Sequence, residues 1–586
     1  MKNRLFLAKH AKLAEKEAGL SLAWRSLRAW RETVFLFLLL VGAARAAELP
    51  PGYAVATPHP LATAAAAEIL DEGGNAFDAA VAASAALTVV ASQSTGIGGG
   101  GFFLLHRESD GLQVFVDGRE VAPLAATADM YLDAKGAADA GASLRGARAA
   151  AIPGLPALWQ HVARKYGSKP LARLLAPAIR LAREGFAIEE PKARLLSRYA
   201  RFSPAAAAVW LPGGKPPAAG AVVRQPDLAA TLARVARDGR AGFYEGELAQ
   251  KLVAGVRAAG GVWQAEDLRG YRVLERKPLH AFFRDYRLTL APPPSAGGVA
   301  LAQALAMLEA RAWPPADAVQ AKHELVEALR RAFGDRRLLG DPDFVGMPLY
   351  RLLSREYLLG LARGIRGDAA TPSEGSPAAG AGNNTAHFSI LDAAGNRVSA
   401  TETVNTEFGS GFMPPGTGVL LNNEMDDFAA SLTASNAYGL VGSAANAIAP
   451  GKRPLSSMTP TFVEGPRGVL IVGSKGGSRI VSQVLSAVLG FTQGQGTAEL
   501  AAAPRLHHQH LPDRIYFEPG ALSPAEQEAL QALGHALRPV PDAWGNLQAV
   551  WWDRDGNGLE AAADPRGVGS VAVRRTRAVA PAQVGR

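Results

Sequence analysis

The amino-acid sequence predicts an α+β protein in which layers of helix pack against layers of β-sheet. Segments with the helical repeat of apolar residues occur along the chain, interspersed with short alternating segments typical of strands. No internal repeat is found, which argues against a solenoid or propeller. With 586 residues, 48% of them hydrophobic, the chain can bury a large core, and this composition excludes a disordered or collagen-like protein.

Residues 155–260 are predicted to be mostly helical. Two Ala-rich helices within 61–90 are separated near Gly74, and Asn75 can cap the second of them. Four consecutive glycines end at Gly101 and precede an apolar strand, so they do not fit a dinucleotide-binding loop, which a helix would follow. The other elements predicted here are helices at 155–166, 171–184, 228–237, 299–309 and 321–336 and strands at 102–105, 112–117 and 286–290.

A change in composition divides the chain near residue 364. Residues 364–384 are rich in Gly, Ala, Ser and Pro and have almost no large apolar side chain, so we expect a flexible linker there. Immediately afterwards, 385–392 and 397–403 alternate in polarity around a turn, which predicts a β-hairpin. A helix at 480–489 and strands at 548–552 and 571–574 are predicted further on.

The N-terminal segment 1–46 is predicted to be a secretory signal peptide. It contains nine basic and three acidic side chains, then about nine apolar residues, then a small-residue stretch around Ala46. About nine residues are too few to span ~30 Å of hydrocarbon, so cleavage after Ala46 is favoured over a retained anchor. We therefore expect a secreted or periplasmic protein.

Charge and cysteine content exclude several classes of function. The N-terminal segment accounts for +6 of the net charge of +9, and no basic run with interleaved aromatics follows it, so nucleic-acid binding is not expected. The absence of cysteine excludes disulfides, thiolate metal sites and a cysteine nucleophile. The acidic residues of 424–427 have no histidine at ligand spacing, so neither a metal nor another cofactor is predicted.

Thr385 is the first candidate for a chemical role, because the linker changes abruptly into a strand there. Cleavage between Asn384 and Thr385 would free the α-amine of the threonine beside its own hydroxyl. An α-amine has a pKa near ~7.7–8.0, so it can act as the base that activates this hydroxyl. The alternative from these residues alone is a threonine favoured at a strand start by its β propensity.

A series of short motifs follows in one order along the chain. They lie at 96–101, 119–123, 153–154, 340–344, 384–387, 403–405, 422–427, 453–457, 473–477 and 563–566. Together they resemble the γ-glutamyltransferase (γ-glutamyltranspeptidase) family of N-terminal-nucleophile hydrolases, and the resemblance spans about residues 50–575. One such motif would be weak evidence, whereas the ordered set is strong.

The resemblance implies a fold, a maturation step and an activity. The fold is a four-layer αββα sandwich built from two autoprocessed fragments, a large subunit 47–384 and a small catalytic subunit 385–586, which stay together as a heterodimer. The activity is that of a γ-glutamyltransferase and glutathione hydrolase. A γ-glutamyl group passes from glutathione or a similar donor to the enzyme, and then to water, an amino acid or a dipeptide.

The resemblance also assigns roles to individual residues. Thr385 is implied as the nucleophile in self-cleavage and in substrate attack, and Thr403 would orient its hydroxyl. Gly476 and Gly477 would present backbone N–H groups to the oxyanion of the tetrahedral intermediate. The implied donor-binding residues are Arg119, Ser456 and Ser457 for the α-carboxylate and Asn405, Glu424 and Asp427 for the α-ammonium.

A lid is implied at 428–442, with Tyr438 in the place of the gating aromatic. The sequence departs from common family patterns at Lys475, where proline is frequent, and at Ala386 and Gly118. None of these changes removes an implied role, although Lys475 leads us to expect a slightly more mobile loop.

Two alternatives remain open. A relative with the same core could act on another acyl amide, as a cephalosporin-type acylase or a polyglutamate-handling enzyme. Arg119, Asn405 and Asp427 argue against this, because they serve the free amino-acid head, and such acylases tend to lack the lid. A non-catalytic protein that keeps the fold could dispense with Thr385 and Thr403, but both are present.

Overall fold

The computed structural model describes residues 49–139, 141–199, 201–375, 384–431 and 434–575. The predicted signal peptide at 1–46 lies outside these residues. Chain contacts separate a unit of residues 1–49 from a unit of residues 50–586, and the second unit contains all the elements below. In the part of the chain that is described, no helix is long and apolar enough to cross a membrane.

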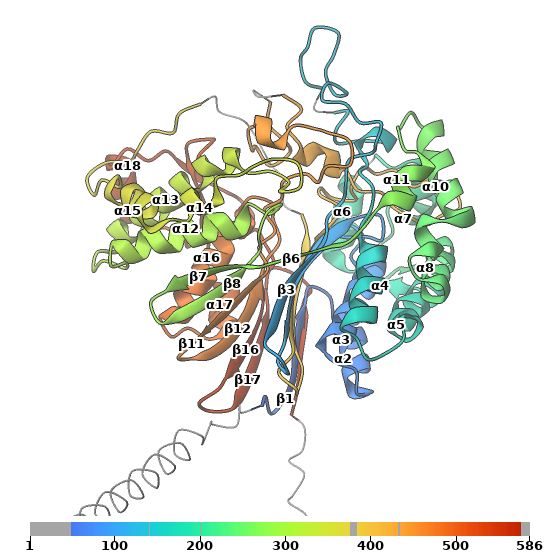
Figure 1. Cartoon of the computed structure of the whole chain (residues 1–586), viewed down its shortest axis with the longest axis horizontal. Coiled ribbons are helices and arrows are strands. Elements are labelled where there is room, and N and C mark those ends of the chain that lie inside the picture. Colours follow the sequence, from blue (N-terminus) through green and yellow to red (C-terminus); the bar gives the residue numbers. More distant parts are fainter. Residues whose placement is uncertain (1–48, 140, 200, 376–383, 432–433, 576–586) are drawn as a thin grey trace, which may run out of the picture. The chain divides into compact units, whose positions relative to one another are not determined.

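Two antiparallel sheets form the centre of this unit (Figure 1). The seven-stranded sheet has the order β18-β1-β9-β10-β2-β3-β6, and the six-stranded sheet has the order β17-β16-β12-β11-β8-β7. The strands of the first are β1 (Gly52–Thr57), β2 (Gly100–Arg107), β3 (Leu112–Gly118), β6 (Leu274–Arg276), β9 (Ala386–Leu391), β10 (Arg397–Thr403) and β18 (Ser570–Arg575). Those of the second are β7 (Leu279–Phe283), β8 (Tyr286–Leu290), β11 (Thr461–Gly465), β12 (Gly468–Gly473), β16 (Gln548–Asp553) and β17 (Gly558–Ala563).

Strand β1 shows how the sequence builds the layers. Successive side chains of a strand point to opposite faces of its sheet. Tyr53 and Val55 enter the core under the helices of the first half of the chain, whereas Ala54 and Ala56 enter the core shared with the second sheet. Both faces of the strand are therefore buried, and small alanines face the neighbouring sheet.

Helices cover the outer faces of both sheets (Figure 1). On the seven-stranded sheet lie α2 (Pro60–Asp71), α3 (Ala76–Val90), α4 (Leu155–Lys165), α5 (Leu171–Glu184), α6 (Glu190–Arg198), α7 (Pro204–Trp210), α8 (Pro226–Asp238), α9 (Ala241–Tyr244), α10 (Gly246–Ala258) and α11 (Ala265–Gly270). The other side has α12 (Gly297–Ala310), α13 (Ala318–Asp335), α14 (Leu349–Leu352), α15 (Arg355–Arg363), α16 (Arg479–Thr492), α17 (Thr497–Ala502) and α18 (Pro524–Ala532). This arrangement confirms the predicted α+β class and its four αββα layers.

Smaller elements complete the fold. A three-stranded sheet is formed by β13 (Leu506–His507), β14 (Ile515–Phe517) and β15 (Leu537–Pro539), and a two-stranded one by β4 (Phe186–Ala187) and β5 (Val222–Val223). The predicted helix at 171–184 and strand at 286–290 coincide with α5 and β8. Asn75 caps α3 as expected, by accepting hydrogen bonds from Phe77 N and Asp78 N. The sequence did not indicate β1, β7, β11 or β12.

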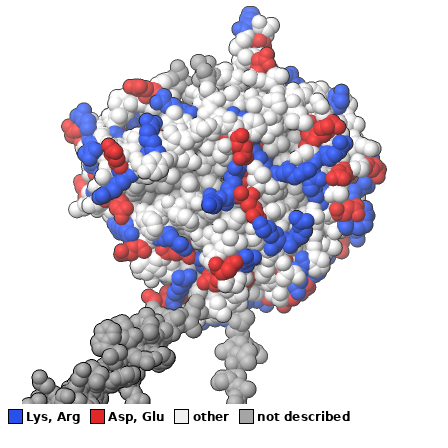
Figure 2. Space-filling model, viewed as in Figure 1, with Lys and Arg blue, Asp and Glu red and all other residues white. Residues whose placement is uncertain are grey.

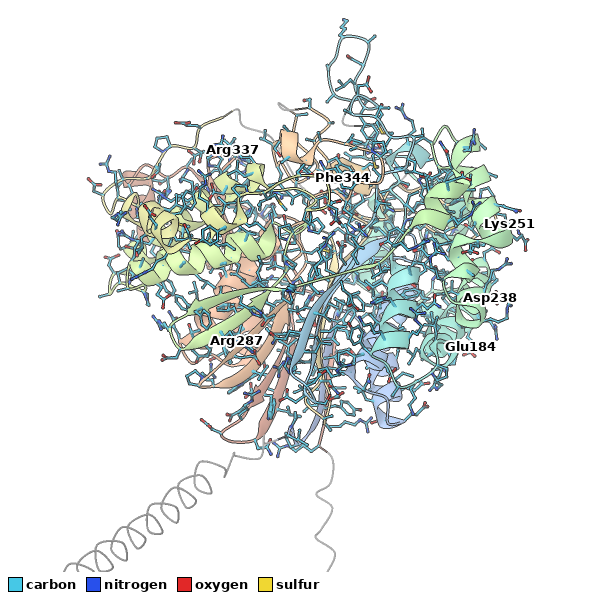
Figure 3. All side chains as sticks on the ribbon, in the orientation of Figure 1. Glu184, Asp238, Lys251, Arg287, Arg337 and Phe344 are labelled. Atoms are coloured by element: carbon cyan, nitrogen blue, oxygen red, sulfur yellow. The ribbon has the colours of Figure 1, made fainter. Side chains whose placement is uncertain are left out.

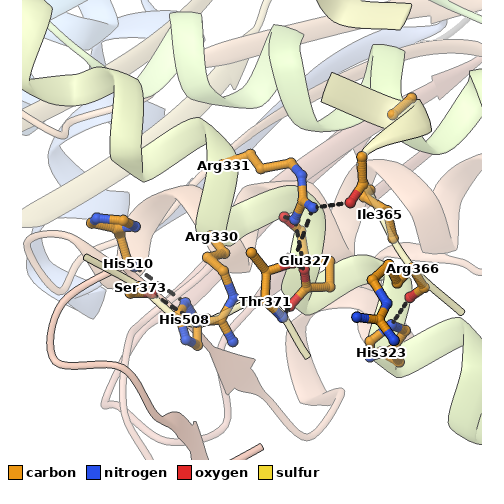
Figure 4. A network of polar contacts seen from close by, with 12 residues as sticks. His323, Glu327, Arg330, Arg331, Ile365, Arg366, Thr371, Ser373, His508 and His510 are labelled. Carbon is orange, nitrogen blue, oxygen red and sulfur yellow. Dashed lines mark hydrogen bonds and ion pairs between the residues drawn. The ribbon is translucent and has the colours of Figure 1, made fainter. Parts of the chain in front are cut away.

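A polar network joins α13 to the chain just before the predicted cleavage site (Figure 4). Glu327 accepts hydrogen bonds from Thr371 Oγ1 at 2.6 Å and from Arg331 Nη1 at 2.6 Å. Arg330 donates to Ser373 Oγ at 2.7 Å and pairs with Asp513. These contacts anchor 371–373, within the stretch that the sequence suggested as a flexible linker. Residues 376–383 of that stretch lie outside the described residues.

Surface charge is mixed on the face seen in Figure 2, where basic and acidic side chains alternate over the second unit. Arg107–Asp110 and Arg194–Glu190 are examples of ion pairs between exposed side chains.

Candidate active site

The candidate site lies at the end of the central hairpin of the seven-stranded sheet. Ala386 of β9 pairs with Glu402 of β10, so Thr385 and Thr403 are the next residues on the two strands. A cavity of about 20 Å³ opens beside them. Its lining includes ten of the residues predicted from the sequence: Arg119, Thr385, Thr403, Asn405, Glu424, Asp427, Tyr438, Ser456, Ser457 and Gly477. Asn384 and Gly476 immediately precede two of these lining residues, Thr385 and Gly477, in the chain.

Thr385 has an unfavourable backbone conformation in the continuous chain. Its φ is +148°, and its side chain is buried. A β-branched residue rarely has φ in this range, and such outliers cost of order ~1–3 kcal/mol. The hydroxyl of Thr385 donates a hydrogen bond to the carbonyl oxygen of Asn384, so the nucleophile predicted from the sequence touches the peptide group that it would attack.

A backbone carbonyl of another segment holds the Asn384 side of this peptide bond. The side-chain amide of Asn384 donates to the carbonyl oxygen of Gln93 at 2.5 Å. On the other strand, Thr403 Oγ1 accepts a hydrogen bond from Asn405 N at 2.8 Å. Among the described residues, no hydrogen bond joins Thr403 Oγ1 to Thr385 Oγ1 in the uncleaved chain, where the Thr385 hydroxyl donates to Asn384.

Arg119 follows β3 and lies at the centre of a buried charge cluster. Its guanidinium is 1% exposed and pairs with Glu424 and with Asp427, the latter at 2.6 Å. A third acid, Glu120, lies 3.8 Å from the same guanidinium and is fully buried. The predicted carboxylate-binding group, Arg119, is therefore paired with two of the three predicted ammonium-binding residues, Glu424 and Asp427.

Two acids of this cluster, Glu120 and Glu424, have pKa values raised above their usual range. Burial raises the pKa of Glu120 to about 7, although Arg119 opposes the shift. Burial and the nearby Glu120 and Asp427 raise the pKa of Glu424 well above its usual range. Three carboxyls around one guanidinium cannot all be ionised cheaply in a dry site, so this cluster retains protons near neutral pH.

The two predicted serines, Ser456 and Ser457, also line the cavity beside Thr385. Ser456 forms an isolated bridge with Ser295, in the Pro-rich turn before α12, and its Oγ accepts from Met458 N at 3.1 Å. No hydrogen bond joins Ser457 Oγ to another described residue. Its hydroxyl is therefore available to a carboxylate bound beside Arg119.

Gly476 and Gly477 precede α16, with φ of +124° and +58°. Among the residues that the structure describes, neither backbone N–H has a hydrogen-bond acceptor. They lie next to the positive end of a 14-residue helix, which favours a negative charge in front of it. At Gly477 a Cβ atom would lie 2.1 Å from the ring of Tyr438, so glycine is required there by space as well as by φ.

Tyr438 holds the predicted lid against the site. Its hydroxyl donates to the carbonyl oxygen of Asn405 at 2.7 Å, and its own carbonyl accepts from Gln509 at 3.0 Å. Asn436 of the same segment donates to Asp427 Oδ1 at 3.0 Å. The segment of Tyr438 is therefore joined both to Asn405, just after β10, and to the charge cluster.

Several residues around the cavity were not among those predicted from the sequence. Arg336 lines it from the end of α13, Glu120 lies behind Arg119, and Gln509 supports the lid. Arg336 and Gln509 belong to no motif, and only the fold brings them to the site. Glu120 is adjacent to Arg119 in sequence, but nothing in the sequence indicates that it is fully buried.

Two stacked antiparallel sheets between helical layers, with a threonine at the start of a central strand, define the class of N-terminal-nucleophile hydrolases. Comparison with known proteins narrows this class. The family model of γ-glutamyltranspeptidase matches residues 62–574, so the chain belongs to the γ-glutamyltranspeptidase family.

Individual relatives agree with this assignment. A glutathione hydrolase proenzyme of Pseudomonas sp. (strain A14) is 41% identical, over 82% of this chain and 85% of its own length. A glutathione hydrolase proenzyme of Escherichia coli (strain K12) is 40% identical, over 88% of this chain and 90% of its own length. Among solved structures, the cephalosporin acylase from Bacillus halodurans has a TM-score of 0.80 at 30% identity, and the match covers 89% of this chain and 96% of that one.

We expect the free energy of unfolding to depend on pH through Glu402, the neighbour of Thr403 in β10. Glu402 is fully buried, accepts a hydrogen bond from Ser84, and has a pKa that burial raises from 4.5 to about 8. An acid with a raised folded-state pKa contributes stability below its unfolded pKa, and this stability is lost as pH rises towards the folded pKa. The slope reaches about 1.4 kcal/mol per pH unit between these limits.

We expect Glu402→Gln, which imitates the protonated side chain, to remove this pH dependence. The free energy of unfolding of the variant minus that of the wild type should rise from pH 4.5 to pH 8 and then level off. Denaturant titrations across this range measure it, and the exposed Glu356→Gln is the matched control. A constant difference would show that the pKa of Glu402 is the same in the folded and the unfolded chain.

Proposed function

We propose that the protein is a γ-glutamyltransferase that acts as a glutathione hydrolase and matures by cutting its own chain between Asn384 and Thr385. One observation carries the proposal: a strained threonine at the start of β9 shares a cavity with the charge cluster of Arg119, Glu424 and Asp427. That cavity joins a nucleophile to groups suited to a zwitterionic amino-acid head.

Self-cleavage is supported by the geometry at Thr385. Its hydroxyl oxygen would attack the Asn384 carbonyl carbon, the C–N bond would break, and the amine would take up the proton. Water would then hydrolyse the ester and release the Asn384 carboxylate. The unfavourable φ of Thr385 favours this step, because the break in the chain relieves it. The products are a large fragment ending at Asn384 and a small one beginning at Thr385.

Donor binding would exchange partners within the charge cluster. The α-carboxylate of the γ-glutamyl group would take the guanidinium of Arg119 together with Ser456 and Ser457, and the α-ammonium would pair with Glu424 and Asp427. A planar guanidinium matches a carboxylate with two parallel hydrogen bonds. Because the substrate brings one charge of each sign, the net charge of the site is preserved.

Catalysis would use the freed α-amine of Thr385 as the base. The hydroxyl oxygen attacks the γ-carbonyl carbon, and the resulting oxyanion accepts hydrogen bonds from Gly476 N and Gly477 N. Loss of one such donor typically costs ~3 kcal/mol of barrier. The leaving amine takes the proton, and water or an acceptor amine then attacks the γ-glutamyl ester and regenerates the hydroxyl. Thr403 is proposed to orient Thr385 once the chain is cut.

An acylase of the same fold is the second candidate, given the likeness to the cephalosporin acylase structure. The charge cluster favours the γ-glutamyl donor, because a glutaryl or similar acyl group has no ammonium for Glu424 and Asp427. The segment of Tyr438, docked on Asn405, also favours it.

Export to the periplasm or the exterior, through the segment 1–46, is part of the proposal. It rests on the sequence pattern of a basic region, a short apolar region and small residues near Ala46.

Intact mass and N-terminal sequencing of the purified protein test the proposal directly. We expect two tightly associated fragments, one with Thr385 at its N-terminus, and release of glutamate from glutathione. The large fragment should begin near Ala47 after export. A single uncleaved chain with full activity, or a processed protein inactive on every γ-glutamyl amide, would contradict it.

A further inference from the structure

The loop of Gly476 and Gly477, which connects β12 to α16, has few hydrogen bonds of its own (Figure 1). Both glycines have positive φ, and the residue before them is Lys475, where proline is frequent in the family. Two successive glycines leave the backbone free to adopt many conformations. Some other group must therefore fix the direction in which their two N–H groups point.

Gln483, in the second turn of α16, holds this loop with both ends of its side-chain amide. Its Nε2 atom donates to the carbonyl oxygen of Lys475 at 2.8 Å and to that of Arg479 at 3.1 Å. Its Oε1 atom accepts a hydrogen bond from Ser474 Oγ at 2.7 Å. The side chain is 2% exposed, so water has little access to these bonds. The amide therefore restrains both residues that precede Gly476.

The surroundings of Gln483 are shaped for this amide. A Cβ atom on Gly545 would lie 1.8 Å from Gln483 Oε1, so only glycine leaves room for the side chain. Ser474 Oγ, which donates to Oε1, also accepts a hydrogen bond from Asn546 N at 3.3 Å. A glutamate in place of Gln483 would put a carboxylate oxygen, which cannot donate, against two carbonyl oxygens. The position therefore suits an uncharged amide of this length.

Lys475 depends on Gln483 for its restraint. Among the described residues, Gln483 is the only one that forms a hydrogen bond with Lys475. A proline at this position would fix φ through its ring, near about −65°. The φ of Lys475 is negative, and no described residue accepts a hydrogen bond from its N–H, so proline would lose no hydrogen bond there. The hydrogen bond from Gln483 thus supplies a restraint that lysine itself lacks.

We propose that Gln483 is a positioning residue, which holds Lys475 so that Gly476 N and Gly477 N point at the oxyanion of the tetrahedral intermediate. Donors that are oriented in advance stabilise the developing charge without reorganisation. Loss of the restraint should therefore raise the barrier of the chemical step and leave donor binding unchanged. Gln483 does not line the cavity beside Thr385, so it acts through the loop. This inference rests on the proposed function and deepens it.

Gln483→Met tests the inference, because methionine has nearly the same length and cannot form the three hydrogen bonds. On processed protein, kcat/KM for γ-glutamyl-p-nitroanilide should fall about 10- to 100-fold, less than the loss of a whole oxyanion donor at its upper limit. Lys475→Pro in the same chain should restore most of this loss, because the ring replaces the missing restraint. Lys475→Pro alone should change kcat/KM by less than about threefold.

Two inhibitors separate positioning from a merely structural role. The glutamate analogue with a boronic acid in place of the γ-carboxylate would form a tetrahedral adduct with the Thr385 hydroxyl, whereas L-norvaline offers only the amino-acid head. In Gln483→Met, the inhibition constant of the boronate should rise by about the factor by which kcat/KM falls, and that of norvaline should change by less than about twofold. Equal changes in both constants would overturn the inference, because Gln483 would then support the donor head or the fold.

Two control variants are matched to these changes. Gln160, on α4, accepts a hydrogen bond from Arg240 N at 2.5 Å and does not line the cavity, so Gln160→Met removes a comparable bond elsewhere. Lys251, exposed on α10, is labelled in Figure 3, and Lys251→Gln reproduces the charge lost in Lys475→Pro. Neither variant should change kcat/KM or the two inhibition constants.

Further variants decide the matter even where Gln483→Met alone gives no processed protein. The double variant with Lys475→Pro should then turn over at a rate within about tenfold of Lys475→Pro alone, and a larger loss contradicts the inference. Ser474→Ala removes only the bond to Gln483 Oε1 and that from Asn546, and it should raise the boronate constant while sparing that of norvaline. An unchanged boronate constant in Ser474→Ala counts against the inference.

Failure of the inference and failure of the proposed function give different results. A wild type that is active while Gln483→Met has unchanged kcat refutes the role of Gln483 alone. A wild type inactive on every γ-glutamyl compound refutes the proposed function instead.

Discussion

Replacement of Thr385 by alanine is expected to leave the protein as one uncleaved chain without γ-glutamyl turnover. Alanine removes the hydroxyl that contacts the Asn384 carbonyl, and with it the nucleophile of both proposed reactions. Loss of a covalent nucleophile typically lowers kcat by several orders of magnitude. Denaturing electrophoresis, intact mass and glutathione hydrolysis measure the two effects on one preparation.

Thr385→Ser is the matched control, because serine keeps the hydroxyl and loses only the methyl group. It should still be processed, more slowly, and should retain part of the activity. If the alanine variant still separates at Asn384–Thr385, another group or a protease cuts the chain, and the self-cleavage mechanism is wrong.

Asp427→Asn is expected to change substrate preference more than any other single substitution in the donor site. The aspartate is paired with Arg119 at 2.6 Å and is proposed to receive the α-ammonium of the donor. Truncation of one member of a buried charge pair typically costs ~2–5 kcal/mol. Turnover of γ-glutamyl amides should fall accordingly, whereas a glutaryl amide, which has no amine, should be affected far less. The ratio of the two kcat/KM values should shift by one decade or more.

Asp426→Asn provides a control at the neighbouring position. Its carboxylate accepts hydrogen bonds from Ser143 at 2.7 Å and Ala437 N at 2.8 Å and does not line the donor cavity. We expect it to affect both substrates alike. An equal loss on both substrates in Asp427→Asn would mean that Asp427 supports the fold or the nucleophile, and the acylase alternative would gain support.

Residues near one another in sequence made much of the site predictable. Thr385 and Thr403 belong to one hairpin, and a hairpin is specified by local alternation and a turn. The motif of 422–427 likewise contributes Glu424 and Asp427 from one short 3₁₀ segment, Glu424–Asp427. Family resemblance then supplied roles that neither periodicity nor spacing could give.

Partners distant in sequence were not predictable. The ion pair of Arg119 with Asp427 joins residues 308 positions apart, so no local pattern of the sequence indicates it. Arg336 carries no motif, and its unsatisfied guanidinium exists only because α13 ends beside the cavity. Backbone strain at Thr385 is likewise set by the fold around it.

The sequence by itself determined the α+β class, the hairpin and the identity of the candidate nucleophile, because these depend on local periodicity and on motif chemistry. Only the tertiary structure decided which charges are buried together, which N–H groups are left without acceptors, and which side chain holds the loop of Gly476 and Gly477. The reason is physical: burial and electrostatic coupling depend on the packing of segments hundreds of residues apart, and no local pattern encodes the distance between them.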